Sequence, residues 1–371
     1  MGTLLDLENG QAGIIVKVKG RGAFRRRITE MGFVRGKEVT VVKSAPLMDP
    51  IEYRIMGYNV SLRKSEGRLI EVITPEEYLM RPVLEGQPLF IDGAQPENLQ
   101  YLPIKEKNKV IDVALVGNPN CGKTTLFNYA SGSKEHVGNF SGVTVEAKTA
   151  RFHQNGYTFN LTDLPGTYSL TAFTPEEVFV NNHILKSMPD VIVNVVVASN
   201  LERNLYLTTQ LIDMDLKVVM ALNMYDEMQA LGDLLDQDAL ANLLGIPIIP
   251  TIGSKGTGLS ELFNKIIDAY EDRDPVERHV HINYGTETEL SLKRVQDQLW
   301  KDKSFTDQFS SRYFALKLLE KDTGTLQDLS PSTVTPEIIS IAEAEISRLE
   351  KLYQEESSTL ITDAKYGFIA G

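Results

Sequence analysis

The stretch that most constrains this chain runs from Gly117 to Thr124 and reads Gly-Asn-Pro-Asn-Cys-Gly-Lys-Thr. It fits the pattern G-x-x-x-x-G-K-[ST], the phosphate-binding loop of nucleoside triphosphatases. The apolar, β-branched run 110–116 before it predicts a buried strand, and residues 124–130 after it predict the first turns of a helix. Strand, loop and helix N-terminus in this order point backbone N–H groups and the positive end of a helix dipole at phosphate. The motif therefore predicts a phosphate-binding site.

Within this loop, two side chains have predicted roles. Lys123 is expected against the β- and γ-phosphates, and the Thr124 hydroxyl is expected on Mg²⁺. The nucleotide-binding residues that we predict here are Gly117, Asn118, Pro119, Asn120, Cys121, Gly122, Lys123, Thr124 and Thr125.

Three later stretches narrow the choice of nucleotide. The first is Asp163-Leu164-Pro165-Gly166, which follows the alternating, strand-like run 157–162. An Asp at a strand end can hold Mg²⁺ through water, and the glycine beside it lets a backbone N–H meet a γ-phosphate. We predict that all four residues contact the nucleotide or its metal.

The other two stretches predict guanine recognition. Asn223-Met224-Tyr225-Asp226 follows the buried run 218–222 and resembles the N-K-x-D element, in which the Asp accepts hydrogen bonds from guanine that adenine cannot donate. Met224 stands where that element has Lys, and the two polar residues remain. Thr251-Ile252-Gly253 follows the run 246–250, where a backbone amide is expected near the guanine oxygen. Four such elements in this order predict a GTPase.

Composition limits the cellular compartment and the class of protein to which this chain can belong. Cys121 is the only cysteine, so the chain has no intrachain disulfide and a reducing compartment is expected. The longest apolar run, 191–198, is too short to cross a bilayer and contains Asn194, so we expect this segment to be soluble.

The net charge is −12, yet residues 1–75 hold 13 Lys or Arg against 8 Asp or Glu. A basic module could meet nucleic acid, anionic lipid or the acidic remainder of the chain.

Residues 1–75 predict a small barrel of short strands. The strand-like runs are 11–19, 37–43, 51–55, 58–62 and 69–73, with a helical insert at 23–31. Arg25, Arg26 and Arg27 could face RNA or DNA, but a solvated helix face or a docking face for an acidic neighbour is the simpler interpretation. Residues 76–107, with four prolines among Glu, Gln and Gly, predict a linker.

Residues 108–275 alternate strands and helices and predict a doubly wound α/β domain. Between the phosphate loop and Asp163, a Thr is needed to close on Mg²⁺ and the γ-phosphate. Thr144 is the candidate for this role and a predicted catalytic residue beside Lys123; Thr149 is the less favoured alternative, and Thr144 as an ordinary strand residue remains open. The predicted Mg²⁺ set is therefore Thr124, Thr144 and Asp163.

The motifs together resemble a known family. GNPNCGKTTLFN, VGNFSGVTVE, DLPGTYSL and NMYD look like the GTPase part of FeoB, the ferrous iron transport protein. The segments 30–36, 45–51 and 56–59 resemble FeoA, its SH3-like partner, so the chain resembles a FeoA–FeoB fusion over nearly its whole length. The resemblance also adds Gly142 and Val143, beside Thr144, to the expected nucleotide contacts.

The resemblance implies a multidomain α/β chain with an SH3-like barrel, a Ras-like GTPase domain and a helical domain at 276–371. Helical periodicity at 287–302, 310–321 and 336–354 agrees with the last of these. In the family this domain slows GDP release and connects the GTPase to the membrane part. The segment 361–369 resembles the one before the first membrane span, so a permease portion is expected after Gly371, at the cytoplasmic face of a bacterial inner membrane. A homo-oligomer is left open.

Two positions depart from a Ras-like enzyme or from the family. Thr167 follows Gly166 where Ras-type enzymes place the Gln that orients water, so slow hydrolysis is expected. In the family, Asn120 and the first switch loop bind K⁺, which can replace an arginine finger; bonding within the loop is an equally good role for Asn120 by sequence alone. Ile252 stands where the family often has Ser.

Three functions compete at this point. The first is a GTPase that regulates or drives Fe²⁺ passage through an attached permease, with GTP and GDP as ligands and the FeoA-like module as an intramolecular partner. The second is an RNA-assembly factor that uses residues 1–75; no aromatic–basic stripe supports it, and no nucleic-acid partner is expected. The third is a nucleotide-gated scaffold with incidental hydrolysis.

Overall fold

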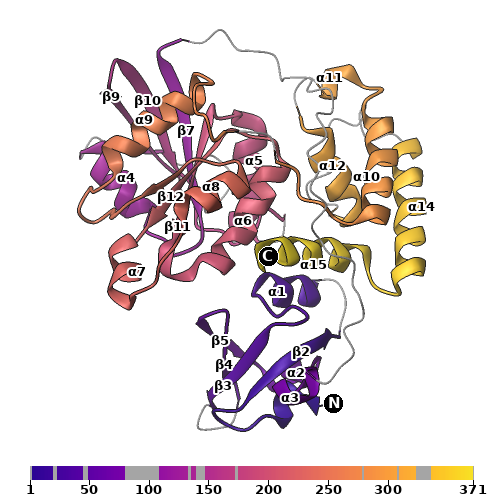
Figure 1. Ribbon diagram of the computed structural model, residues 1–371. Helices are drawn as coiled ribbons and strands as arrows, with labels where there is room; N and C mark the ends of the chain where they lie inside the picture. Colours follow the sequence, from indigo (N-terminus) through magenta and orange to yellow (C-terminus); the bar gives the residue numbers. More distant parts are fainter. Residues whose placement is uncertain are drawn as a thin grey trace. The chain divides into compact units, whose positions relative to one another are not determined.

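The computed structural model describes residues 2–19, 23–44, 49–79, 108–132, 135–138, 147–171, 174–277, 280–306, 309–322 and 336–370. These residues fall into two compact units: Met1–Asp92 together with Thr359–Gly371, and Gly93–Ser358 (Figure 1).

The first unit is built on a six-stranded antiparallel sheet in the order β1-β6-β2-β3-β4-β5. Five of its strands were predicted, and the short first strand was not. The strands are β1 (Gly2–Thr3), β2 (Ala12–Val18), β3 (Glu38–Ser44), β4 (Ile51–Ile55), β5 (Tyr58–Leu62) and β6 (Ile70–Ile73).

Alternate side chains of these strands form one apolar core, in which Ile15, Val39, Tyr53 and Ile70 are wholly buried. This is the period-2 pattern of a sheet with one buried face. The helices of this part are η1 (Leu4–Asp6), α1 (Ala23–Glu30), α2 (Lys64–Gly67) and α3 (Pro75–Leu79).

Helix α3 begins where the linker was expected to begin. Thr74 and Glu77 form a capping box: the Glu77 N–H donates to Thr74 Oγ1 (3.2 Å), and the Thr74 N–H donates to Glu77 Oε2 (3.3 Å). The T-x-x-E spacing is a helix-start signal that the proline-rich composition concealed. Residues 80–107 lie outside the described residues.

The second unit contains a seven-stranded sheet in the order β13-β12-β11-β7-β10-β9-β8. The first five strands of this order are parallel, and β9 and β8 are antiparallel additions at one edge. The strands are β7 (Val110–Gly117), β8 (Glu135–Gly138), β9 (Ala147–Gln154), β10 (Tyr157–Asp163), β11 (Val191–Val197), β12 (Val218–Asn223) and β13 (Ile248–Pro250).

Helices cover both faces of this sheet, as the doubly wound prediction requires. On one face, α4 and α9 pack against Ile111, Val113 and Val193 in the main core. On the other, α6 is joined to β11 where Asn194 Nδ2 donates to Thr208 Oγ1 (2.7 Å). The helices are α4 (Lys123–Ser131), α5 (Pro175–Ser187), η2 (Ala198–Asn200), α6 (Leu201–Asp213), α7 (Tyr225–Leu231), α8 (Gln237–Leu244) and α9 (Leu259–Tyr270).

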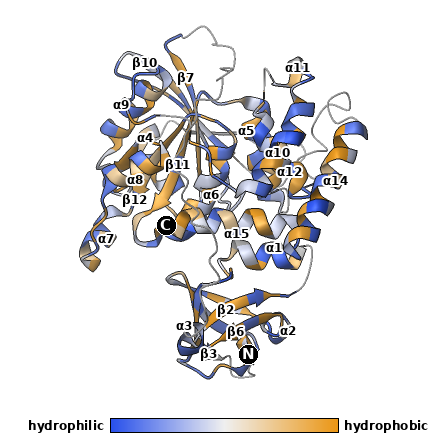
Figure 2. Ribbon diagram, turned by 45° about the vertical axis from the view of Figure 1, so that its right-hand side comes forward, coloured by the Kyte–Doolittle hydropathy of each residue, from blue (hydrophilic) through white to orange (hydrophobic). Residues whose placement is uncertain are grey.

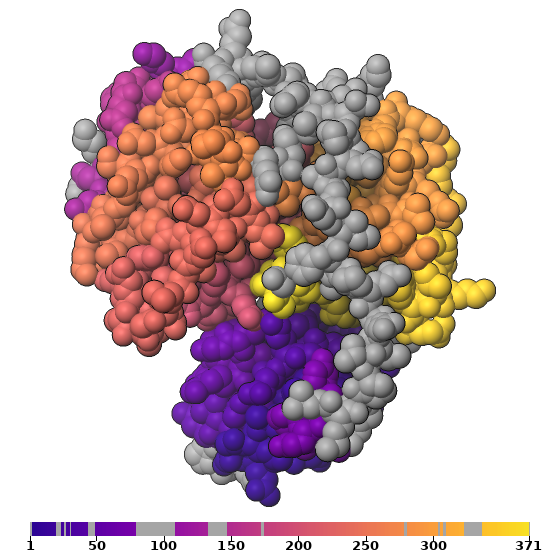
Figure 3. Space-filling view, in the orientation of Figure 1, coloured from indigo at the N-terminus to yellow at the C-terminus, as the bar shows by residue number. Residues whose placement is uncertain are grey.

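The figures show how these layers are filled. The central strands carry the hydrophobic colour in Figure 2, because a parallel sheet covered on both faces has little need for polar side chains. In the space-filling view of Figure 3, the chain from α7 to α9 forms one continuous surface, coloured salmon to orange.

The helical part of the second unit packs α10 against α12 and α14 (Figure 1). The Tyr313 hydroxyl donates to Asn181 Oδ1 of α5 (3.0 Å), and the Tyr284 hydroxyl donates to Asp213 Oδ2 of α6 (2.6 Å). Both bonds are buried and tie this part to the sheet-flanking helices. The helices of this part are α10 (Thr286–Leu299), α11 (Lys303–Thr306), α12 (Ser311–Leu319) and α14 (Pro336–Tyr353). The last helix, α15 (Ser357–Ala370), belongs to the first unit from Thr359 onward.

Candidate nucleotide-binding site

The phosphate loop has the backbone that its motif requires. It leaves β7 at Gly117 and enters α4 at Lys123, and both Asn120 (φ 64°) and Gly122 (φ 87°) are left-handed. A Cβ on Gly122 would lie 2.4 Å from Asn223 Nδ2, and one on Gly117 would lie 2.3 Å from the Val195 carbonyl oxygen. Both glycines are therefore needed for close approach as well as for backbone freedom.

Lys123 reaches back over this loop. Its amine donates to the carbonyl oxygens of Gly117 (3.0 Å) and Asn118 (3.3 Å), and the side chain is buried. A cation held in this way is placed at the centre of the loop, where an anionic phosphate oxygen is attracted to it. Cys121 is also buried, and burial raises the pKa of its thiol, so the neutral thiol packs in the core.

Two predicted metal ligands meet beside the loop. The Thr124 hydroxyl donates to Asp163 Oδ2 (2.7 Å), although the residues are 39 positions apart. They meet because β7 and β10 are parallel neighbours with Asp163 in register with Leu115. A hydroxyl and a carboxylate are hard oxygen donors that suit Mg²⁺. The predicted third ligand, Thr144, and the neighbouring Gly142 and Val143 lie outside the described residues, while Thr149 lies in β9 opposite Thr162.

Asn223 is the polar centre of the site. Its Nδ2 donates to the Cys121 carbonyl oxygen (2.8 Å), and its Oδ1 accepts from the Gly253 N–H (2.9 Å) and the Thr251 hydroxyl (3.2 Å). One buried amide thus joins the phosphate loop to the segment after β13. Sequence reasoning treated Asn223 only as a reader of guanine, because nothing in a linear motif shows that these two loops meet.

Asp226 lies in the first turn of α7, after Met224, whose left-handed backbone (φ 55°) begins the helix. Its Oδ2 accepts from Lys255 Nζ (2.8 Å), and this hydrogen bond lowers the pKa of the carboxyl, which keeps it ionised. Lys255 was not among the predicted site residues. Lys255 lies in a hairpin in which the Ile252 N–H donates to the Thr257 carbonyl oxygen (3.1 Å). Nothing in the sequence around Lys255 indicates that it pairs with Asp226.

The segment after Asp163 is held close to the phosphate loop. Leu164 is buried, and its N–H donates to the Leu115 carbonyl oxygen (3.2 Å). A Cβ on Gly166 would lie 2.8 Å from Pro119 Cα, so Gly166 allows the two loops to touch. Among the remaining predicted contacts, Asn120 and Thr125 are exposed, and Asn118, with 4 % of its surface exposed, is buried.

Thr167 does not present its hydroxyl as a substitute for the missing Gln. Only 2 % of its surface is exposed, and the hydroxyl donates to the Ser169 carbonyl oxygen (2.6 Å). Its N–H donates to the Gly117 carbonyl oxygen (3.2 Å). Both polar groups are engaged in the fold of this segment, which agrees with the expectation that the residue does not orient water.

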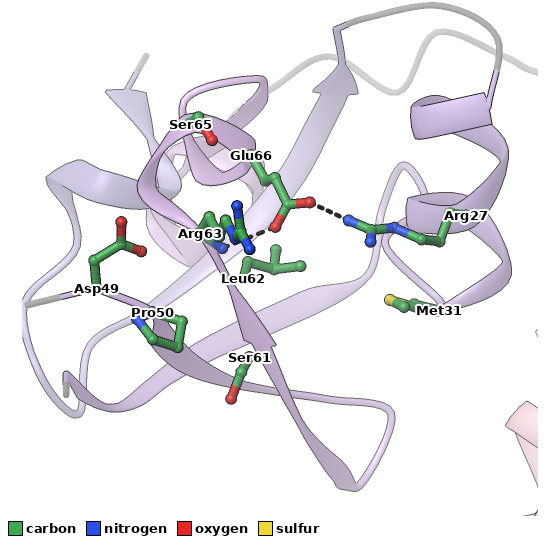
Figure 4. Close-up of a pocket in the computed structure, with 9 residues that line it drawn as sticks. All are labelled: Arg27, Met31, Asp49, Pro50, Ser61, Leu62, Arg63, Ser65 and Glu66. Carbon is green, nitrogen blue, oxygen red and sulfur yellow. Dashed lines mark hydrogen bonds and ion pairs between the residues drawn. The ribbon is translucent and has the colours of Figure 1, made fainter.

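The N-terminal unit has a hollow of its own, with a volume of about 730 Å³ (Figure 4). Two of its charged groups pair with each other, Arg27 with Glu66, and Asp49 Oδ1 accepts from the backbone N–H of Lys64 (3.1 Å). The lining residues are Arg27, Met31, Asp49, Pro50, Ser61, Leu62, Arg63, Ser65 and Glu66. This set contains neither a nucleophile beside a base nor a group of metal ligands.

No three His, Cys, Asp or Glu side chains in the described ranges gather closely enough to hold a metal ion. None of the helices in the described parts combines the length and apolar character needed to cross a membrane.

Known families match this chain in three consecutive blocks. Residues 2–74 match the FeoA domain, 111–266 match Ferrous iron transport protein B, and 284–371 match the FeoB cytosolic helical domain. The Fe(2+) transport protein A/Fe(2+) transporter FeoB fusion protein of Porphyromonas gingivalis is 42 % identical over 99 % of this chain and 46 % of its own length. The Fe(2+) transporter FeoB of Salmonella typhimurium is 35 % identical over 71 % of this chain and 33 % of its own length.

Solved structures agree with the sequence relatives. An S. thermophilus NFeoB mutant bound to GDP is 33 % identical, covers 70 % of this chain and 98 % of its own, and superposes with a TM-score of 0.63. The cytosolic domain of T. maritima FeoB in a GDP form covers 70 % of this chain and 96 % of its own, with 33 % identity and a TM-score of 0.57. The chain spans less than half the length of the curated relatives it matches. The predicted fold and resemblance are confirmed: this chain belongs to the FeoB family of ferrous iron transport proteins and carries a FeoA domain ahead of its GTPase and helical domains.

Proposed function

We propose that this chain binds GTP with Mg²⁺ and hydrolyses it to GDP and phosphate, and that the cycle regulates or drives Fe²⁺ passage through a permease portion C-terminal to Gly371. The main observation in support is that Lys123, the Thr124–Asp163 pair and Asn223 lie together where the parallel strands end. Ligands of open α/β sheets bind at this edge. Two solved structures that resemble this chain, an S. thermophilus NFeoB mutant and the cytosolic domain of T. maritima FeoB, are named as GDP forms, which supports the proposal.

The roles of individual residues follow from their chemistry. Lys123 would exchange its two loop carbonyls for phosphate oxygens, which are stronger partners because they are charged. Thr124 and Asp163 would hold Mg²⁺, directly and through water, and bound Mg²⁺ neutralises charge on the phosphates. Asp226 would accept hydrogen bonds from the guanine ring, and Thr251, Ile252 and Gly253 would border the base.

Hydrolysis by this site is proposed to be slow and to depend on potassium. Thr167 engages its hydroxyl with Ser169, so no side chain at that position orients water. Asn120 is exposed and has a left-handed backbone, and its amide oxygen would be the ligand of the cation. A cation there, together with the switch residue Thr144, would offset the charge that grows on the β–γ bridging oxygen.

Two further parts of the proposal concern the setting of the site. The GTPase would work at the cytoplasmic face of a bacterial inner membrane, and the FeoA domain would act as a regulatory module in the same chain. The helical domain would slow GDP release through its buried bonds to α5 and α6, Tyr313 to Asn181 and Tyr284 to Asp213.

GTP turnover in potassium and in sodium at equal ionic strength tests this proposal. We expect faster turnover in potassium and loss of most of the difference in Asn120→Ala. GDP titration of the same variant serves as a folding control and should still show saturable binding. Equal rates of the parent chain in both salts would reject the potassium site, and no turnover above the uncatalysed rate in either salt would reject the enzyme.

A further inference from the structure

One face of helix α6 holds the segment that follows Gly166. The guanidinium of Arg203 lies over the ring of Tyr168, with Cζ 4.0 Å from the ring centroid. Two turns further along α6, Gln210 Oε1 accepts a hydrogen bond from the Leu170 N–H (2.6 Å). Residues seven apart share a helix face, so Arg203 and Gln210 contact the segment from the same side.

The other end of this segment rests on the phosphate loop. The Thr167 N–H donates to the Gly117 carbonyl oxygen (3.2 Å), and Gly166 packs against Pro119. Residues 166–170 are therefore fixed at both ends, by the loop that would bind phosphate and by α6. Tyr168 lies between the two attachments, so its position determines how the backbone of Gly166 and Thr167 meets the loop.

The buried state of Gln210 indicates that this contact serves more than packing. Only 1 % of the Gln210 surface is exposed, and its amide nitrogen has no hydrogen-bond acceptor within the described part of the chain. Burying an unsatisfied donor costs stability, which an apolar side chain of similar size would avoid. An apolar side chain could not accept the hydrogen bond from the Leu170 N–H, which Gln210 does accept.

We propose that Arg203 and Gln210 are positioning residues for GTP hydrolysis, which hold residues 166–170 so that the backbone beside Gly166 stays in register with the phosphate loop. The inference rests on the proposed GTPase function and deepens it. Because Thr167 offers no side chain to the attacking water, backbone placement carries more of the catalysis here than in an enzyme with Gln at that position. A displacement of about 1 Å in such a site costs on the order of 100-fold in rate.

The test uses the full 371-residue chain and the ring contact, because Tyr168 and Arg203 are both only half-buried. Tyr168→Leu and Arg203→Ala should each lower kcat by roughly two- to thirtyfold, the range for loss of a cation–π contact. The double variant should be no slower than the worse single variant, because both remove one interaction. Tyr168→Phe keeps the ring and should retain most of the rate.

Three measurements separate positioning from general damage. GDP affinity by titration should stay within about twofold of the parent in every variant, so the effect falls on kcat. Arg151→Ala, which removes an exposed arginine from β9, is the matched control and should leave kcat unchanged. Gln210→Leu should lower kcat in the same direction as Arg203→Ala.

Three outcomes would overturn the inference while the GTPase proposal stands: the parent hydrolyses GTP and the variants match it, the two single effects multiply in the double variant, or GDP affinity falls in step with kcat. A parent chain that binds GDP but shows no turnover would instead reject the proposed enzyme.

Discussion

The two sheets of this protein differ in where the loops that follow their strands lie. In the antiparallel sheet β1–β6, successive strands run in opposite directions, so the loops divide between its two ends. In the sheet β7–β13, five parallel strands bring the loops after β7, β10, β12 and β13 to one edge. Strand direction therefore decides where separated motifs can meet and form a site.

The two regions also differ in what their buried polar groups do. In the N-terminal sheet, the Tyr53 hydroxyl makes a long contact with the Leu4 carbonyl oxygen (3.5 Å) inside an apolar core. In the parallel sheet, the buried amide of Asn223 joins two loops at the edge. The first region is expected to respond to mutation mainly in stability, and the second mainly in ligand binding.

The largest expected effect is on the stability of the N-terminal sheet. Tyr53→Ala removes a wholly buried ring and should lower the local unfolding free energy by about 3 to 5 kcal/mol. Hydrogen exchange of the β2–β6 amides in the full chain measures this quantity. Tyr78→Ala, at a residue with 39 % of its surface exposed, is the control and should cost far less. A parallel loss of GDP affinity in Tyr53→Ala would break the division between the regions.

Next in size is the loss of nucleotide binding in Lys123→Ala. Removing a charged donor at the centre of the phosphate loop should weaken GDP and GTP binding by on the order of 100-fold. Titration with a fluorescent nucleotide measures the change, with Lys109→Ala, an exposed lysine just before β7, as the control. Unchanged affinity in Lys123→Ala would contradict the assigned site.

A change of base preference should follow in Asp226→Asn. An amide reverses part of the donor and acceptor pattern, so GTP affinity should fall by on the order of 100-fold and xanthosine triphosphate should become the better ligand. Competition titrations of both nucleotides measure the ratio. Asp238→Asn, an exposed carboxylate on α8, should leave it unchanged. Equal preference in Asp226→Asn and the parent would show that Asp226 does not contact the base.

The smallest effect is a pH dependence confined to the N-terminal sheet. Burial raises the pKa of Tyr53 from 10.0 to about 12. Because the folded-state pKa is the higher one, the stabilising contribution is complete below pH 10 and is lost as the pH rises from 10 to 12. The loss should be on the order of 2 kcal/mol, and it should be absent from Tyr53→Phe. Identical alkaline profiles of the parent and Tyr53→Phe would rule it out.

Much of the architecture could be read from the sequence. The strands of both sheets, apart from β1, β8, β9 and β11, were predicted from apolar runs and alternation, and α10, α12 and α14 from helical spacing. The run that forms β11 was noted only as the longest apolar run of the chain. Strand β9 was missed because Lys148, Arg151 and His153 interrupt its apolar pattern; antiparallel pairing with β10 holds it in the sheet. Helix α3 was missed because its capping box stood at the start of a proline-rich stretch.

The candidate site was predictable to a similar extent. The phosphate loop was recognisable because its glycines, Lys123 and Thr124 are neighbours in the chain, and their spacing carries the chemistry directly. Asp163, Asn223 and Asp226 were predicted from shorter motifs, which indicate a GTPase only because they follow the phosphate loop in a fixed order. Lys255, Arg203 and Gln210 carry no motif of this kind and were not named.

The sequence by itself determined the class of protein, because each motif joins a strand to a loop within about ten residues and needs no distant partner to be read. Only the tertiary structure decided how the motifs cooperate. The Asn223 amide reaches Cys121 across 102 positions, and Thr124 reaches Asp163 across 39. Such distances depend on which strands are neighbours in the sheet, and that order is set by the packing of the whole domain.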